Sequence, residues 1–68
     1  MNVKFNSHTD LETGAMYHSL EFPVGTPEAA AKKAVANADP KMWDHLYEIR
    51  RTQNGGRVLV EYEYRVTP

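Results

Sequence analysis

The fold of this chain is decided by residues 42–66, which read MWDHLYEIRRTQNGGRVLVEYEYRV. From Val58 to Val66, β-branched and aromatic residues alternate with Leu59, two glutamates and an arginine. This period-two pattern predicts a strand with one buried face. The first half of the stretch alternates less regularly, and the two halves meet at Asn54-Gly55. Asn-Gly is the dipeptide most typical of a two-residue hairpin turn, so we predict a β-hairpin.

The register of this hairpin depends on where the turn lies. A turn at Asn54-Gly55 gives a buried face on which Ile49 pairs with Val60, Tyr47 with Tyr62, His45 with Tyr64, and Trp43 with Val66. On the opposite face it pairs Asp44 with Arg65 and Glu48 with Glu61. A turn at Gly55-Gly56 shifts the register by two residues, keeps the same faces, and replaces the Asp44–Arg65 pair by Arg50–Glu61. We prefer the Asn54-Gly55 turn.

The chain before the hairpin predicts two strands and a helix. Val3 and Phe5 mark a short first strand, residues 7–14 read as a loop, and residues 15–24 alternate as a second strand. Thr26-Pro27-Glu28 is a strong helix start, and the alanine-rich helix is predicted to run to about Ala38, before Pro40. The order β-β-α-β-β predicts a single α+β domain over residues 1–68. Its four-stranded, mainly antiparallel sheet would carry the helix on one face.

Composition excludes several classes of protein. The chain has 68 residues, no cysteine and a formal net charge of −1. It therefore has no disulfide framework and lacks the strongly basic balance of most nucleic-acid-binding domains. No stretch approaches the ~20 apolar residues of a membrane span, and the N-terminus does not resemble a signal peptide. We expect a cytoplasmic protein that does not act on membranes.

The residues suited to catalysis or metal binding do not form a recognisable set. The chain has three histidines, of which His18 and His45 fall on predicted buried faces and His8 in a polar loop. At most two donors converge anywhere, and a metal site or a catalytic site needs more. We predict no enzyme, no metal and no cofactor.

Binding of a protein partner is the function that the sequence favours. Arginines cluster near the predicted hairpin tip, and guanidinium groups suit contact with carboxylates or phosphates. Leu46 and Leu59 are expected to lie next to each other on the exposed face of the hairpin, ringed by charge, as in a modest protein interface. The predicted partner-binding residues are Leu46, Glu48, Arg50, Arg51, Arg57, Leu59, Glu61 and Arg65. A regulator or inhibitor of a host protein, of the kind that phages encode, is the sharpest form of this hypothesis.

Four alternatives stay open. The arginine-rich tip and the sheet tyrosines suit a single-stranded nucleic-acid-binding module, although glutamates lie between them. A small ligand-binding or enzymatic domain would need a concave pocket near His18 or His45. A homodimer that covers the free sheet face or pairs free strand edges would add stability to so small a core. Finally, the arginines serve equally well as ordinary solubilising residues.

One stretch resembles a known family. The run Leu20-Glu21-Phe22-Pro23-Val24, followed by Thr26, Glu28 and Ala29-Ala30, resembles the strand-to-helix passage of the small host RNA polymerase inhibitors of T7-like phages. A strand with paired charge, here Glu48-Ile49-Arg50-Arg51, follows the helix in both. The likeness covers about a third of the chain and rests on a capped helix after a strand, a feature that many small α+β domains share. Residues 57–66 have no counterpart in that family. The resemblance implies that Arg50 and Arg51 contact the polymerase.

Overall fold

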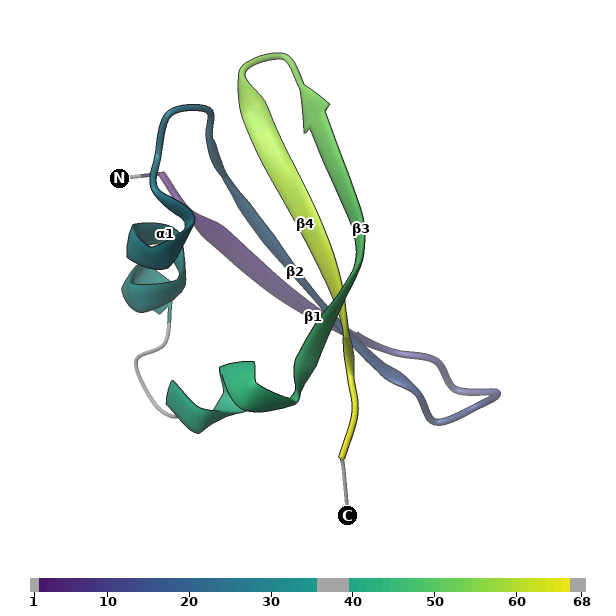
Figure 1. Cartoon of the computed structure of the whole chain (residues 1–68). Coiled ribbons are helices and arrows are strands. Elements are labelled where there is room, and N and C mark those ends of the chain that lie inside the picture. The colour runs from purple at the N-terminus through teal and green to yellow at the C-terminus, as the bar shows by residue number, and fades with distance from the viewer. Residues whose placement is uncertain (1, 36–39, 67–68) are drawn as a thin grey trace.

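The computed structural model describes residues 2–35 and 40–66 of the chain (Figure 1). Its elements, in chain order, are β1 (Lys4–Thr9), β2 (Met16–Pro23), α1 (Glu28–Val35), the 3₁₀ helix η1 (Pro40–His45), β3 (Leu46–Asn54) and β4 (Arg57–Tyr64). The helix begins where the sequence predicts, at Glu28, directly after Pro27. Its predicted end at Ala38 lies outside the described residues.

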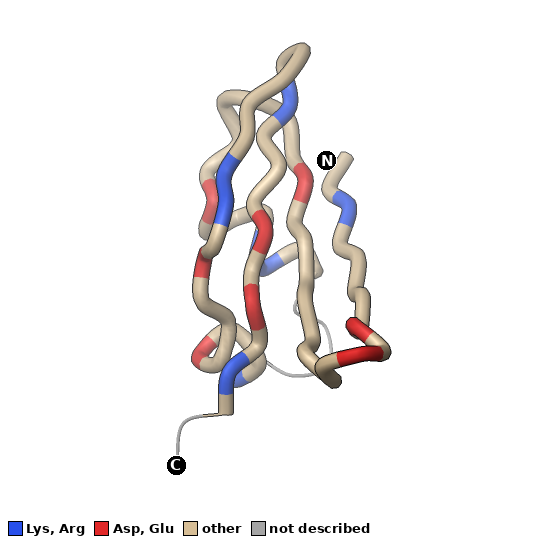
Figure 2. Tube along the Cα trace, turned by 90° about the vertical axis from the view of Figure 1, so that its right-hand side faces the viewer, with Lys and Arg blue, Asp and Glu red and all other residues tan. Residues whose placement is uncertain are grey.

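The four strands form one antiparallel sheet in the order β1-β2-β4-β3. The last strand of the chain is therefore inserted between β2 and β3, and the connection from β2 to β3 carries α1 and η1 over one face of the sheet (Figure 1). None of the helices in the described part of the chain lies over the opposite face (Figure 2). This arrangement is the predicted α+β fold with its helix on one face.

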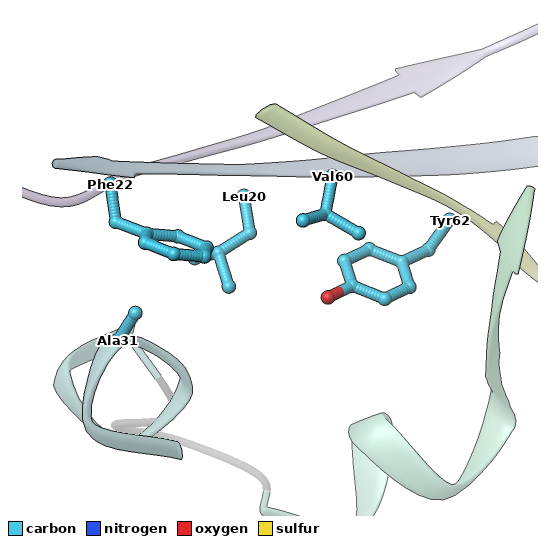
Figure 3. Close-up of a cluster of buried hydrophobic side chains, with 5 residues drawn as sticks. All are labelled: Leu20, Phe22, Ala31, Val60 and Tyr62. Carbon is cyan, nitrogen blue, oxygen red and sulfur yellow. The ribbon is translucent and has the colours of Figure 1, made fainter. Parts of the chain in front are cut away.

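The hydrophobic core lies between α1 and the two central strands (Figure 3). Its buried members are Leu20, Phe22, Ala31, Val60 and Tyr62. Partly buried side chains that pack against them are Val3, Phe5, Val35, Trp43, Leu46 and Val58. The small side chain of Ala31, which is fully buried, lets α1 approach β2 closely. The prediction that Val60 and Tyr62 point inward beneath an alanine-rich helix is confirmed.

The first strand is longer than the sequence suggested, because the polar run Ser7-His8-Thr9 pairs with β2 and does not form a loop. The turn that follows is closed by its own hydrogen bonds. The amide of Gly14 donates to the carbonyl of Asp10 (2.7 Å), and the amide of Asp10 donates to the carbonyl of Ala15 (2.8 Å). Residues with high turn propensity can occupy a strand when ladder hydrogen bonds to a neighbouring strand are available.

The hairpin turn lies at Gly55-Gly56, so the preferred Asn54-Gly55 turn is wrong and its alternative is right. Asn54 pairs with Arg57 across the turn, and Arg50 pairs with Glu61. Gly55 and Gly56 have φ values of 58° and 81°, whereas every non-glycine residue in the described part of the chain has negative φ. A type I′ turn needs positive φ at both central positions, and two glycines adopt it with less strain than Asn-Gly.

A β-bulge at Ile49 changes the strand register in the half of the hairpin that lies farther from its turn. The register shifts between Glu48 and Arg50, so that Glu48 pairs with Tyr62 and Leu46 with Tyr64. One extra residue in a strand exchanges the two faces beyond it. The predicted burial of Tyr47 and Ile49 is therefore wrong, since these side chains are 38% and 50% exposed.

The predicted start of this strand is also corrected. Trp43 and His45 belong to η1 and not to β3, and Val66 lies beyond β4 with its side chain 72% exposed. The predicted Trp43–Val66 strand pair does not form. Trp43 nevertheless reaches the core from η1, where its ring packs edge-on against Phe5 and Tyr62.

The position of the turn can be tested by two alanine substitutions. Gly56→Ala forces a β-carbon into a left-handed conformation and should lower the free energy of unfolding by about 1 kcal/mol. Asn54→Ala, at a residue with negative φ, should change it far less. Equilibrium urea denaturation measures both variants. A neutral Gly56→Ala together with a destabilising Asn54→Ala would instead place the turn at Asn54-Gly55.

Candidate protein-binding face

One face of the sheet has none of the described helices over it (Figure 2). Directly paired residues of neighbouring strands project to the same side of a sheet, so the register defines which side chains it carries. From β1 to β3 these are Lys4, Asn6, His8, Tyr17, Ser19, Glu21, Arg57, Leu59, Glu61, Glu63, Thr52, Arg50 and Tyr47. We call this surface the open face. Figure 2 shows that acidic and basic positions are interspersed on its strands.

A shallow hollow of about 450 Å³ lies on the open face. Its lining residues come from all four strands and are Asn6, Ser7, His8, Tyr17, His18, Ser19, Ile49 and Glu61. The side chain of Ile49 is half exposed there because the bulge places it on this side. The floor of the hollow therefore combines an aliphatic and an aromatic side chain with amide, hydroxyl, imidazole and carboxylate groups.

The predicted partner-binding residues divide between the two faces. Arg50, Arg57, Leu59 and Glu61 lie on the open face. Leu46 and Glu48 lie on the helix side, where Leu46 packs against the core. The expectation that Leu46 and Leu59 lie next to each other is wrong, because the bulge moves Leu46 to the other side of the sheet.

Arg51 is held on the helix side by two carboxylates. Its Nη2 atom donates to Glu28 of α1 at 2.7 Å and to Glu48 at 2.8 Å. The Tyr62 hydroxyl lies 3.4 Å from the same Glu28 oxygen. The hydrogen bond from Arg51 lowers the pKa of Glu48, and burial raises the pKa of Tyr62, so the carboxylate is charged and the phenol neutral. This cluster links α1 to β3 and β4, which gives Arg51 a structural role within the chain.

Arg57 also has a structural role, at the end of the sheet next to the β3–β4 turn. Its Nε atom donates to Glu21 at 2.8 Å, and its Nη2 atom donates to the backbone carbonyl of Asn2 at 2.9 Å. The ladder between β1 and β2, continued by two residues, would place Asn2 opposite Pro23. Proline has no N–H, so the ladder cannot supply a donor there. The guanidinium of Arg57, which is opposite Pro23 in β4, supplies it.

Two further charged pairs lie on the open face. Arg50 and Glu61 are 3.9 Å apart and well exposed, at 72% and 39% of their side-chain surface. The guanidinium of Arg65 contacts Glu63 and lies over the ring of Tyr47, 5.2 Å from its centroid. Exposed ion pairs of this kind contribute little to stability, so these groups can exchange partners at small cost.

His18 and Ser7 form a hydrogen-bonded pair at the edge of the core. The His18 Nδ1 and Ser7 Oγ atoms are 2.9 Å apart, and the His18 ring stacks on Phe5 at a centroid distance of 5.4 Å. Burial lowers the pKa of His18, so the ring is neutral in the folded state at neutral pH. No acidic group adjoins this pair among the contacts of the described residues, and residues 2–35 and 40–66 contain no cluster of three potential metal ligands. The pair is best explained as a satisfied buried histidine.

The sequence did not identify the hollow. Alternation in residues 15–24 places Tyr17 and Ser19 away from the core, but a concave surface cannot be read from alternation. The sequence predicts His8 in a loop and Ile49 on the buried face, whereas both line the hollow. An imperfect alternation in residues 43–49, with Leu46 among polar neighbours, was the signal that a bulge could have explained.

Comparison with known proteins adds no relative: no protein-family model, no curated protein and no solved structure matches the chain. Within the part of the chain that the structure describes, no helix is long and apolar enough to cross a membrane.

The burial of His18 predicts an acid-dependent loss of stability. Its folded-state pKa lies below the ordinary value of 6.5, so the unfolded state binds more protons as the pH falls through that value. The free energy of unfolding should therefore decrease between about pH 7.5 and about pH 5.5. In His18→Gln this part of the decrease should disappear. Urea denaturation at the two pH values measures it, and an unchanged slope in the variant would contradict the assignment.

The role of Arg57 predicts a difference between two arginines. Arg57→Met removes the ion pair with Glu21 and leaves the Asn2 carbonyl without its donor, and should lower the free energy of unfolding by about 1 kcal/mol. Arg50→Met, which removes an exposed pair, is the matched control and should be near neutral. Thermal and urea denaturation measure both. Equal effects would show that the contact with Asn2 carries no stabilisation.

Proposed function

We propose that this chain is a non-enzymatic α+β binding module that recognises another protein through the open face of its sheet. The observation that carries the proposal is the hollow on that face, together with the half-exposed side chains of Ile49 and Tyr47 beside it. Sheets of small α+β domains are stable with one face in water, so exposure alone means little. Exposed aromatic and aliphatic side chains next to arginines, however, match the composition of protein interfaces.

The charges of the open face favour a protein partner over a phosphate backbone. Glu21, Glu61 and Glu63 lie there, each in contact with an arginine of the same surface. A nucleic acid would be repelled by these carboxylates. A protein partner can offer groups of both signs, and the exposed Arg50–Glu61 and Arg65–Glu63 pairs can rearrange to meet them.

The positions of the tyrosines argue against a single-stranded nucleic-acid-binding module. It needs several tyrosines on one accessible surface for base stacking. Tyr62 is 3% exposed and Tyr64 projects to the helix side, which leaves Tyr17 and Tyr47 on the open face. These two belong to strands that β4 separates.

The small-ligand alternative is favoured by one observation, because the hollow has several polar groups on its floor, although the register turns the His18 side chain toward the helix side. The hollow is shallow and open, whereas sites for small molecules usually enclose most of the ligand. We therefore place a side chain of a protein partner in the hollow, with an apolar part against Ile49.

This proposal is tested by cross-linking capture with matched variants. Ile49→Asp puts a charge at the wall of the hollow and should abolish capture of partners that the wild-type chain retains. Lys33→Glu, on the exposed side of α1, is the control and should leave capture unchanged. Proteins lost with Ile49→Asp and retained with Lys33→Glu would support the proposal. If both variants capture the same proteins as wild type, the open face is not the binding surface.

A further inference from the structure

The two free edges of the sheet are built differently. β3 carries the bulge at Ile49 and three charged residues around it, Glu48, Arg50 and Arg51. Bulges and charges are the devices by which proteins keep an edge strand from pairing with another chain. β1 carries no bulge and a single charge, Lys4: its six residues form an uninterrupted ladder with β2 and contain no proline. β1 is therefore the edge that is open to a further strand.

The hydrogen bonds of β1 show which backbone groups are available for such pairing. The amide of Asp10 donates to the carbonyl of Ala15, so the backbone of Asp10 points toward the β2 side. Backbone direction alternates along an antiparallel strand, so Lys4, Asn6 and His8 also bond toward β2. Phe5, Ser7 and Thr9 then direct their N–H and C=O groups outward, and all of β1 except Phe5 is exposed.

These outward groups allow only a few ways of pairing β1 with a second copy of itself. In an antiparallel pair of two β1 strands, residues whose backbone groups point outward must lie opposite residues of the same kind in the second copy. The two sheets then join with matching faces on the same side. Among the registers with extensive overlap, one has its two-fold axis at Ser7 and pairs Phe5 with Thr9 of the second copy. The other has its axis at Asn6 and pairs Phe5 with Ser7 of the second copy.

Side-chain chemistry distinguishes these two registers. With the axis at Ser7, Lys4 lies opposite Asp10 of the second copy, and the symmetry repeats this pair. Leu11, whose side chain is 95% exposed in the isolated chain, lies just beyond this pair in the turn that follows β1. With the axis at Asn6, Lys4 instead lies opposite His8, which gives no attraction. Opposite charges that face each other across strands stabilise a pair.

We propose that the chain forms a two-fold symmetric homodimer by antiparallel pairing of β1 with β1 of a second copy, centred on Ser7 and with Lys4 facing Asp10. The two sheets then form one continuous sheet with the open faces on the same side. Asn6 and His8, which line the hollow, lie opposite His8 and Asn6 of the second copy. Each hollow therefore borders on the partner copy. This inference does not depend on the proposed function.

The dimer should be weak and therefore dependent on concentration. One strand pair buries less surface than the roughly 1,200–2,000 Å² typical of stable complexes. The test is sedimentation velocity from about 10 μM to about 1 mM, a range that covers weak association. The wild-type chain should show a monomer–dimer equilibrium within it. Lys4→Glu places like charges at both symmetry-related pairs and should raise the dissociation constant by at least about tenfold.

A charge exchange separates this interface from any other. Asp10→Lys alone should also be monomeric, because lysine then faces lysine. In an equimolar mixture of Lys4→Glu and Asp10→Lys, however, both cross-copy pairs are favourable, so a heterodimer should form. Asp10 accepts a hydrogen bond from the Glu12 amide within its turn, so circular dichroism must show that Asp10→Lys is folded. If it is not folded, Lys4→Met takes its place: this variant loses the attraction to Asp10 without adding repulsion, and should weaken the dimer less than Lys4→Glu does.

The control is Lys33→Glu, which makes the same charge change on α1 and should leave the equilibrium as in wild type. A wild-type chain that stays monomeric over the whole concentration range overturns the proposal. A dimer that persists in Lys4→Glu overturns it as well, since that result would place the interface away from Lys4, for example at β3. Failure of the Ile49→Asp capture experiment bears only on the proposed function.

Discussion

The contact on which the rest of this structure depends is the pairing of Leu20 with Val60 at the centre of the sheet. These are the two largest fully buried side chains in the described part of the chain, and they come from the neighbouring strands β2 and β4. Ala31 of α1 belongs to the same cluster and has no exposed surface. A chain of this length buries only about 60% of its unfolded surface, so such a core leaves little apolar area elsewhere. The aromatic side chains around this core and the ion pairs must therefore help to hold α1 and η1 on the sheet.

Long charged side chains also help to hold α1 on the sheet. Lys32 of α1 places its ammonium 5.2 Å from the ring centroid of Trp43 and 5.7 Å from that of Tyr62. Arg51 joins Glu28 to Glu48 on the same side. The helix has few direct contacts with the sheet beyond β2, so these long side chains extend its attachment to β3, β4 and η1.

The sequence predicted the fold class and the central strand well, and the half of the hairpin farther from its turn poorly. Alternation from Val58 to Tyr64 is unbroken, so its buried face could be assigned from pattern alone. The same reasoning failed at Tyr47, because a bulge exchanges faces without changing composition. The residues predicted to bind a partner divide accordingly: Leu59 and Glu61 on β4 lie on the predicted side, whereas Leu46 does not. The hollow needs side chains from four strands, and their order could not be derived from the sequence.

The bulge at Ile49 explains three properties of the molecule at once. It turns Glu48 toward the helix side, where the ion-pair cluster with Arg51 can form. It places Ile49 at the hollow and Tyr47 beside Arg65 on the open face. It also interrupts the regular outer edge of β3. If one extra residue protects that edge, the absence of a bulge on β1 is informative, because both strands are terminal in the same sheet and face the same risk of unwanted pairing. If neither edge had a partner, selection against aggregation would act on both edges equally. Because β3 is interrupted and β1 is regular, β1 is the edge that can pair with another strand.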